Sequence, residues 1–164
     1  MYKIFLNVVL ILFVALFAGC FSKKKFADLN IDKVHELSIV NTRKAQINSC
    51  KNSKVIIVAT YLNPIKISLL KNDKENFIVG IYIDKQNQAK NLNPFYKILL
   101  NNDNEIDMIK KIDKDSIYMK MIPLVNKWAD YYLIQFPKKD TKKLALVFQT
   151  NNGSKALLAF EKEF

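Results

Sequence analysis

Residues 144–150 read LALVFQT and residues 155–162 read KALLAFEK, with the tetrapeptide NNGS at 151–154 between them. Asn-Gly between two alternating apolar runs is the strongest short-range sign of a β-hairpin, because both residues tolerate positive φ. Since side chains alternate along a strand, each run presents one apolar face. The members of that face are Leu144, Leu146, Phe148, Ala156, Leu158 and Phe160. This stretch therefore predicts two paired strands with one buried side.

Upstream of the hairpin, short apolar runs recur between clusters of Asn, Asp, Lys and Pro. The run at 54–62 is continuous and β-branched, as in a central strand that is buried on both faces. We predict strands at this run and at 36–41, 65–70, 76–83, 95–100, 116–124 and 129–136. One short helix is expected over 104–111, because Ile106, Ile109 and Ile112 recur at three-residue spacing.

Short strands at regular spacing, without long helices between them, predict a mainly β fold. We expect an antiparallel β-sandwich that forms a single domain over 34–164, with one short connecting helix near 104–111. The arrangement resembles the immunoglobulin-like sandwich of several small bacterial lipoproteins. The Cys-Trp-Cys pattern of antibody domains is absent, so this resemblance is one of architecture only.

The N-terminal sequence MYKIFLNVVLILFVALFAGC contains one Lys and then an apolar run from Val8 to Ala18. That run suits the core of a signal peptide and is shorter than the roughly 20 residues that span a bilayer. Leu16-Phe17-Ala18-Gly19-Cys20 resembles the bacterial lipobox. The resemblance implies that residues 1–19 are a lipoprotein signal peptide. It also implies that Cys20 is lipidated, with a diacylglycerol and an N-acyl chain.

A lipid anchor and tether is expected over residues 20–33. Two or three acyl chains anchor a protein stably, whereas a single chain binds only marginally. Phe21, not Asp, follows Cys20, and by resemblance to Gram-negative lipoproteins this implies the outer membrane, with the domain facing the periplasm. In a Gram-positive cell the same anchor lies in the outer leaflet of the cell membrane.

The formal net charge is +11, and all but one of the basic residues are Lys. Two interpretations stay open. A basic face binds anionic lipid or cell-wall carboxylates, or Lys, Asn and Ile are abundant because the genome is rich in AT. We favour the second. We expect no nucleic-acid partner, since no motif of interleaved aromatic and basic residues is present.

Histidine, cysteine and glycine are too scarce for most catalytic and cofactor sites. His35 is the only histidine, and no Gly-x-Ser-x-Gly elbow or Gly-rich phosphate loop occurs. Carboxylates alternate at Asp103, Glu105 and Asp107, but the Gly and Glu that an EF-hand calcium loop requires are missing. We therefore expect no enzymatic activity, no metal, and no cofactor beyond the covalent lipid.

Four further residues are candidates for interactions, and one glycine indicates a local backbone feature. Cys50 is a candidate free thiol, because lipidation of the other cysteine leaves it without an intramolecular partner. Trp128, Tyr131 and Tyr132 form a candidate aromatic contact patch for a sugar or a peptide. We favour the alternative in which Trp128 is a core residue. Gly80, inside a predicted strand, indicates a bulge or a close backbone approach.

These features predict a lipid-anchored cell-envelope lipoprotein that acts as a non-enzymatic interaction or structural module. Its expected partners are the membrane, through the lipid anchor, and an envelope protein, through sheet faces or edges. The alternative is a periplasmic carrier or sensor that holds a small apolar or glycan ligand between the sheets. A cavity between the sheets would favour the carrier, and a fully packed core would argue against it.

Overall fold

The computed structural model describes residues 31–48, 54–65, 70, 73–83 and 95–162. Within these residues there are eight strands, one α-helix and two short 3-10 helices. In chain order they are α2 (Ile31–Val40), β1 (Thr42–Asn48), β2 (Lys54–Tyr61), η2 (Asn63–Ile65), β3 (Lys74–Ile83), β4 (Phe95–Leu100), β5 (Met108–Ile112), η4 (Ile117–Met121), β6 (Asp130–Pro137), β7 (Lys143–Thr150) and β8 (Lys155–Glu161). No helix in these ranges is long and apolar enough to cross a membrane.

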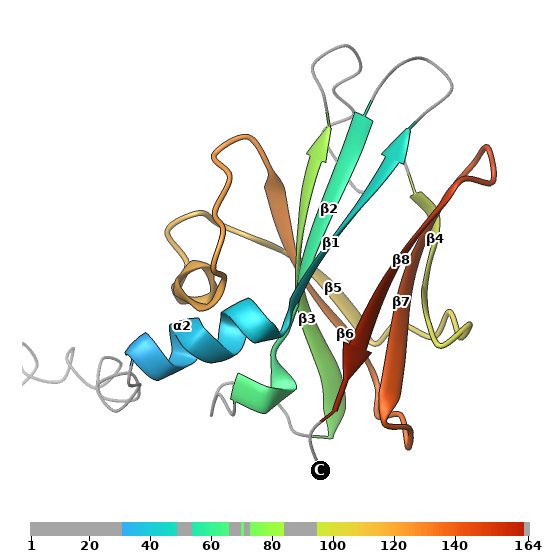
Figure 1. Cartoon of the computed structure of the whole chain (residues 1–164). Coiled ribbons are helices and arrows are strands. Elements are labelled where there is room, and N and C mark those ends of the chain that lie inside the picture. The colour runs from blue at the N-terminus through green and yellow to red at the C-terminus, as the bar shows by residue number, and fades with distance from the viewer. Residues whose placement is uncertain (1–30, 49–53, 66–69, 71–72, 84–94, 163–164) are drawn as a thin grey trace, which may run out of the picture. The chain divides into compact units, whose positions relative to one another are not determined.

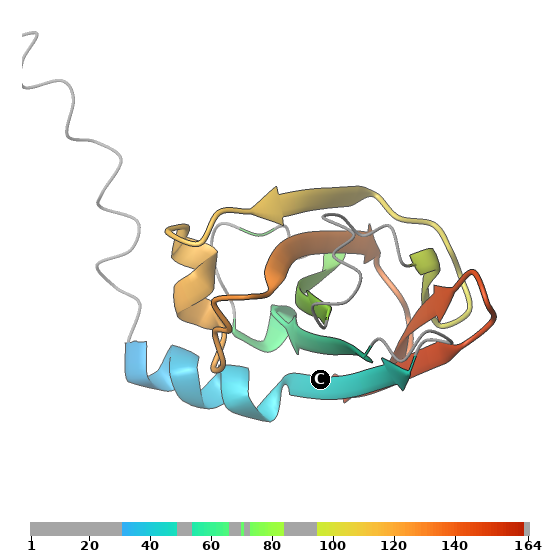
Figure 2. The ribbon, with the colours of Figure 1, turned by 90° about the horizontal axis from the view of Figure 1, so that it is seen from above.

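Two antiparallel sheets contain these strands (Figure 1). The larger sheet has the order β1-β2-β3-β6-β5, and the smaller one has the order β4-β7-β8. β1 and β8 are edge strands that pack beside each other, so the strands surround a common interior (Figure 2). Arg43 of β1 donates from Nε to the carbonyl of Ala159 of β8 at 3.1 Å. The two sheets therefore meet along β1 and β8, but these strands are not paired by a β-ladder.

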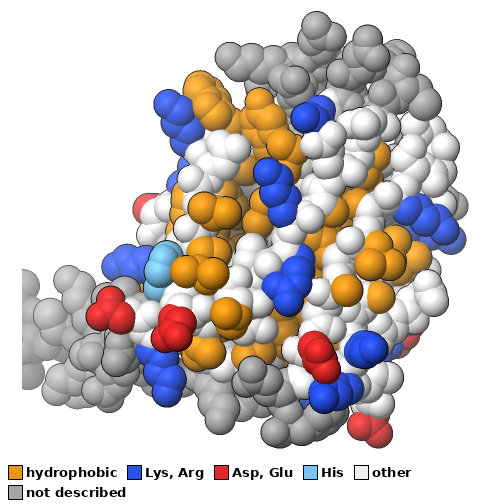
Figure 3. Space-filling view, in the orientation of Figure 1, with side chains coloured by type: hydrophobic (Ala, Val, Ile, Leu, Met, Phe, Trp, Pro, Cys, Tyr) orange, Lys and Arg blue, Asp and Glu red, His pale blue; other side chains and the backbone are white. Residues whose placement is uncertain are grey.

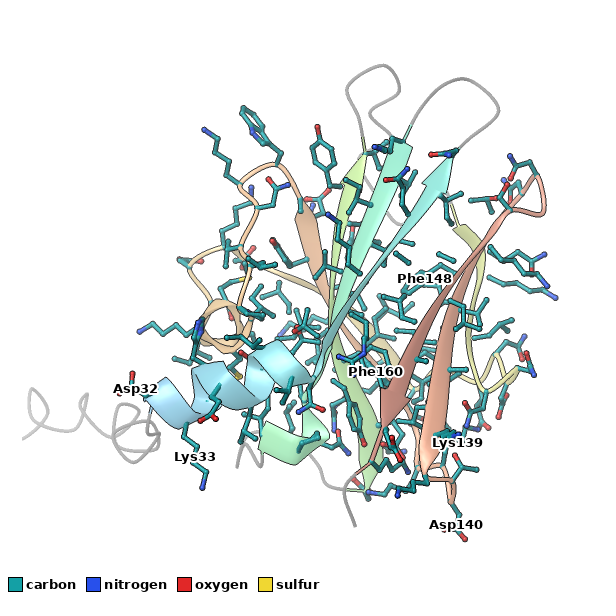
Figure 4. All side chains as sticks on the ribbon, in the orientation of Figure 1. Asp32, Lys33, Lys139, Asp140, Phe148 and Phe160 are labelled. Atoms are coloured by element: carbon teal, nitrogen blue, oxygen red, sulfur yellow. The ribbon has the colours of Figure 1, made fainter. Side chains whose placement is uncertain are left out.

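The inner faces of both sheets share one hydrophobic core. Ile57, Phe77 and Ile134 of the larger sheet have no exposed area, and neither has Phe148 of the smaller one. Figure 4 shows Phe148 and Phe160 directed from β7 and β8 toward the interior. The ring centroids of Phe160 and Phe77 lie 5.3 Å apart, which is a direct contact across the sheets. Each such side chain contributes about 1.5–3 kcal/mol on burial, so this core is the main stabilising element.

Most of the predicted strands are confirmed. The predicted hairpin is β7–β8, with Gly153 at a φ of 83° in its turn and the predicted face buried. The runs at 54–62, 76–83, 95–100 and 129–136 correspond to β2, β3, β4 and β6. The sequence does not indicate β1, because TRKAQIN is largely polar and only Ile47 is fully buried. Of the strand expected at 65–70, Ile65 lies in η2 and positions 66–69 lie outside the described residues.

The strand expected at 36–41 is wrong, because α2 covers this segment. Val34 and Ser38 are buried, and their four-residue spacing places them on one face of the helix, which packs beside η2, η4 and β2. The hydroxyl of Thr42 donates to the Ser38 carbonyl at 2.6 Å and also lies 2.7 Å from the hydroxyl of Thr60 on β2. This pairing satisfies a carbonyl that a helix end leaves without a partner. The helix therefore passes directly into β1.

The helix expected over 104–111 is also wrong. Met108–Ile112 is β5, which pairs with β6 at the edge of the larger sheet. Ile106 packs against the core from the preceding loop, whereas Ile109 on β5 is 43% exposed. The three isoleucines therefore lie in a loop and a strand, not on one face of a helix. The pairing of β5 with β6 overrides the weak helix propensity of this segment.

The strand expected over 116–124 is replaced by η4 and an irregular loop. Ser116 stands at the N-cap of η4, where its side chain accepts a hydrogen bond from the Tyr118 amide. Met119 and Met121 are buried although they are not part of the core between the sheets, and η4 packs beside α2, so the apolar pattern of this segment arises from a short helix. The loop that follows η4 leads into β6.

A buried ion pair joins the two sheets at the end of the molecule where Lys139 lies (Figure 4). Glu75 of β3 has no exposed area, and its Oε1 accepts a hydrogen bond from Lys162 Nζ, just after β8, at 2.6 Å. Tyr61 donates to Oε2 at 2.6 Å and the Lys139 amide donates to Oε1 at 3.0 Å. Burial by itself raises the pKa of Glu75, but these donors outweigh burial and hold the pKa below its ordinary value.

Removing the cation from this pair will destabilise the fold. Lys162→Met leaves a buried carboxylate without its partner, which costs about 3–5 kcal/mol of the free energy of unfolding. Lys142→Met is the matched control, because the Lys142–Glu161 pair is exposed and such pairs contribute little. Denaturant titration of both variants measures the difference, and equal losses would contradict this account.

The same carboxylate will make stability depend on acid pH. Because the folded-state pKa of Glu75 is lowered, its contribution is fully present above the ordinary glutamate pKa of about 4.3. That contribution is lost as pH falls through the lower, folded-state pKa. We expect the stability gap between the wild type and Glu75→Gln to close over this acid range. A gap that stays constant with pH would show that Glu75 does not titrate in this way.

Candidate functional site

One row of residues crosses the outer face of the larger sheet. The register pairs Lys44 of β1 with Val58 of β2, Val58 with Gly80 of β3, and Gly80 with Tyr131 of β6. A Cβ atom on Gly80 would lie 2.6 Å from Cε1 of Tyr131, so the tyrosine ring rests against the glycine. The sequence predicted a bulge or a close backbone approach at Gly80; the register is regular there, and the group that approaches is a side chain.

Tyr131 holds a loop in place above this row. Its hydroxyl accepts a hydrogen bond from the Asn126 amide at 2.6 Å, and burial raises its pKa. The side-chain oxygen of Asn126 accepts a hydrogen bond from the Trp128 amide at 2.9 Å. The backbone carbonyl of Asn126 accepts a hydrogen bond from the Ala129 amide at 3.1 Å. Lys114 Nζ also donates to the carbonyl of Lys127. The loop 123–129 is thus fixed by bonds at both its backbone and its side chains.

We call the space between loop 123–129 and the sheet the outer groove. Its volume is about 640 Å³, within the usual range of small-molecule sites. The floor is formed by Ile56, Val58, Gly80 and Tyr82, with Lys44 and Tyr131 at its sides and the loop as its wall. Figure 3 shows hydrophobic side chains gathered over this loop and the neighbouring strands, with Lys and Arg side chains among them.

The loop carries exposed apolar side chains. Leu124 is 68% exposed, Val125 is 56% and Trp128 is 63%. The expectation that Trp128 is a core residue is therefore wrong, because the loop keeps it outside the sheet. Of the three residues of the predicted aromatic patch, Trp128 and Tyr131 line the groove, whereas Tyr132 points into the core from the other face. The sequence prediction left residues 125–128 between two expected strands, at 116–124 and 129–136, but gave no sign that the loop stands over the sheet.

The charge around the groove is positive. Lys44 and Lys127 are among its lining residues, and no Asp or Glu is among those that are described. The Lys127 ammonium lies 5.0 Å from the centroid of the Trp128 ring, a cation–π arrangement that orders both side chains. An apolar surface with cations at its margin is suited to a ligand that combines an apolar body with negative charge.

The other candidate residues lie elsewhere. His35 is exposed on α2, not on a strand. Asp103 and Asp107 form ion pairs with Lys139 and Lys74. No group of three potential metal-ligating side chains occurs in the parts of the chain that the structure describes. Cys20, which is the predicted lipidation site, and Cys50 both lie outside those parts.

The two neighbouring tyrosines will respond differently to loss of the hydroxyl. Tyr131→Phe removes a hydrogen bond that holds the loop, which costs about 1 kcal/mol of the free energy of unfolding and alters Trp128 fluorescence. Tyr132→Phe is the matched control, because its buried hydroxyl has no hydrogen-bond partner among the described residues. Removing an unpaired buried hydroxyl is neutral or stabilising. Thermal unfolding and emission spectra test both, and an unchanged loop signal in Tyr131→Phe would contradict the assignment.

Comparisons with known proteins provide no further guide to the site. No family model, no curated protein and no solved structure matches the chain. The function must therefore be argued from the residues of the outer groove themselves and from the N-terminal sequence.

Proposed function

We propose that this protein is a lipid-anchored cell-envelope protein, and that its β-rich part is a non-enzymatic binding module. Acyl chains on Cys20 hold it at the outer membrane, facing the periplasm, or at the outer leaflet of a Gram-positive cell membrane. The observation that carries the binding role is the outer groove, where Leu124, Val125 and Trp128 are exposed on a fixed loop. Exposed apolar side chains gathered in one place are typical of an interaction site.

The fold proposed for this module is an antiparallel β-sandwich of immunoglobulin-like type. Two sheets with a shared core and aromatic contacts between them support this arrangement. Such a scaffold holds its loops at fixed positions, as the loop beside β6 is held here. Binding through a fixed loop needs little reorganisation and so loses little entropy.

The second candidate function is that of a carrier or sensor for a small ligand. The space between the sheets does not support the version with an interior ligand, since Ile57, Phe77 and Phe148 fill it with no exposed area. A carrier would therefore hold its ligand in the outer groove. The volume of about 640 Å³ and the apolar floor favour this possibility.

Site-specific photocrosslinking in the native membrane tests the proposed function. A benzoylphenylalanine placed at Leu124 lies in the groove wall, and one at Leu157 on β8 is the matched control, because Leu157 is 60% exposed outside the groove. We expect a discrete adduct with an envelope component from position 124 alone. Equal adducts at both positions, or none at 124, would contradict binding at the groove.

The anchor is tested in the same strain with Cys20→Ala. We expect loss of palmitate labelling, loss of the protein from the membrane fraction, and a weaker adduct at position 124. If Cys20→Ala fractionated with membranes and labelled as the wild type does, the anchor would be wrong. The crosslinking result at the groove would be judged separately.

A further inference from the structure

We propose that the outer groove binds an amphipathic anion, and that Lys44 pairs with its negatively charged group. This inference rests on the proposed function, because it names the ligand class of the same groove. The apolar or aromatic body of the ligand lies over Val58, beside the Tyr131 ring that covers Gly80, and extends toward Trp128. The ligand is recognised as a monomer, through charge at one side of the groove and apolar contact along its floor.

The floor is shaped by the side chains that the register aligns. Gly80 lacks a side chain at the middle of the row, and Tyr131 occupies that space by lying against the glycine. Neighbouring strands lie about 4.8 Å apart, so roughly 14 Å separate Lys44 on β1 from Tyr131 on β6. The result is a shallow apolar strip that ends in a cation, which matches an extended molecule with a charged end.

Lys44 is suited to the charged group. It lies on the outer face of the edge strand β1, and no ion pair links it to an acidic side chain in the described ranges. The five lysines in those pairs lie outside the groove lining, as do their carboxylates. An incoming anion therefore meets no competing carboxylate among the described lining residues.

Lys127 has a different part in the groove. Its ammonium lies over the Trp128 ring, and its carbonyl accepts a hydrogen bond from Lys114. It therefore orders Trp128 as a wall for the apolar body and adds to the positive potential. Loss of Lys127 will reduce affinity less than loss of Lys44, because its charge is already engaged with the ring.

The chain has a single tryptophan, so Trp128 emission reports directly on the groove. The core residues all lie in the compact unit Ile31–Phe164, which is tested as that fragment. The probe is dodecanoate, below its micelle concentration and at low ionic strength. We expect saturable binding with a blue shift, and weaker or no binding of dodecanol, of inorganic phosphate and of dodecyltrimethylammonium.

Variants of exposed lysines then test the charged end. Lys44→Gln will weaken dodecanoate binding about fivefold, the effect of losing one exposed charge pair. Lys44→Arg will restore most of that affinity, and Lys44→Glu will shift the preference from dodecanoate to dodecyltrimethylammonium. Lys155→Gln, on β8 outside the groove, is the matched control and leaves binding unchanged.

Three outcomes would overturn the inference. Equal binding of dodecanol and dodecanoate, unaffected by Lys44→Gln, would leave an apolar groove without charge recognition. A Trp128 shift with vesicles of anionic phospholipid, but not with monomeric dodecanoate, would identify a membrane contact instead. No binding of any probe, together with a discrete protein adduct at Leu124, would refute the amphipathic anion and retain the proposed function.

Discussion

The alignment of the two sheets depends on one buried charge pair between them. Glu75 enters the interior from β3, and Lys162 reaches it from the chain that follows β8. Two buried charges are costly unless each has a partner and further hydrogen bonds. Tyr61 and the Lys139 amide supply those bonds, so the carboxylate is satisfied only when both sheets and the 138–142 segment are correctly placed. Because the donors come from both sheets, the pair favours the alignment in which Glu75 meets all of them.

The outer groove depends on a different constraint, which acts on the opposite face of the same sheet. β3 carries Glu75 toward the interior and Gly80 toward the outside. Tyr131 lies where the glycine side chain would be, and from there its hydroxyl reaches Asn126. The position of loop 123–129 therefore depends on the absence of a side chain at Gly80, which lies on β3, two strands away from Lys44 on β1. Core packing and groove geometry are linked because one strand provides both.

The sequence predicts those parts of the fold in which local pattern and tertiary position agree. Asn152-Gly153 lies between alternating strands, and the run at 54–62 lies in the sheet interior, so local pattern and burial coincide there. Prediction of secondary structure fails where the structure of a segment is set by its contacts with other elements. Ser38 is polar yet fully buried in a helix, and β5 has one buried residue at a sheet edge. The local sequence therefore did not distinguish a helix from a strand in either segment.

The candidate site illustrates the same limit. Gly80 and Tyr131 were each conspicuous in the sequence, but their contact depends on the register between β3 and β6, which single-sequence patterns do not provide. Trp128 was expected in the core because tryptophan is usually well buried. Its exposure follows from loop 123–129, which keeps its side chain outside the sheet. The lysines of the groove could not be separated from the many other lysines by composition.

The junction between α2 and β1 has a mechanical consequence. No loop separates the two elements, and Thr42 links the end of the helix to Thr60 of the adjacent strand. Tension applied through the chain that precedes Ile31 must pass along α2 before it loads the sheet. A helix with few buried side chains opens at a lower free energy than a strand paired in a sheet. Under such tension we expect α2 to open before β1, the strand that carries Lys44.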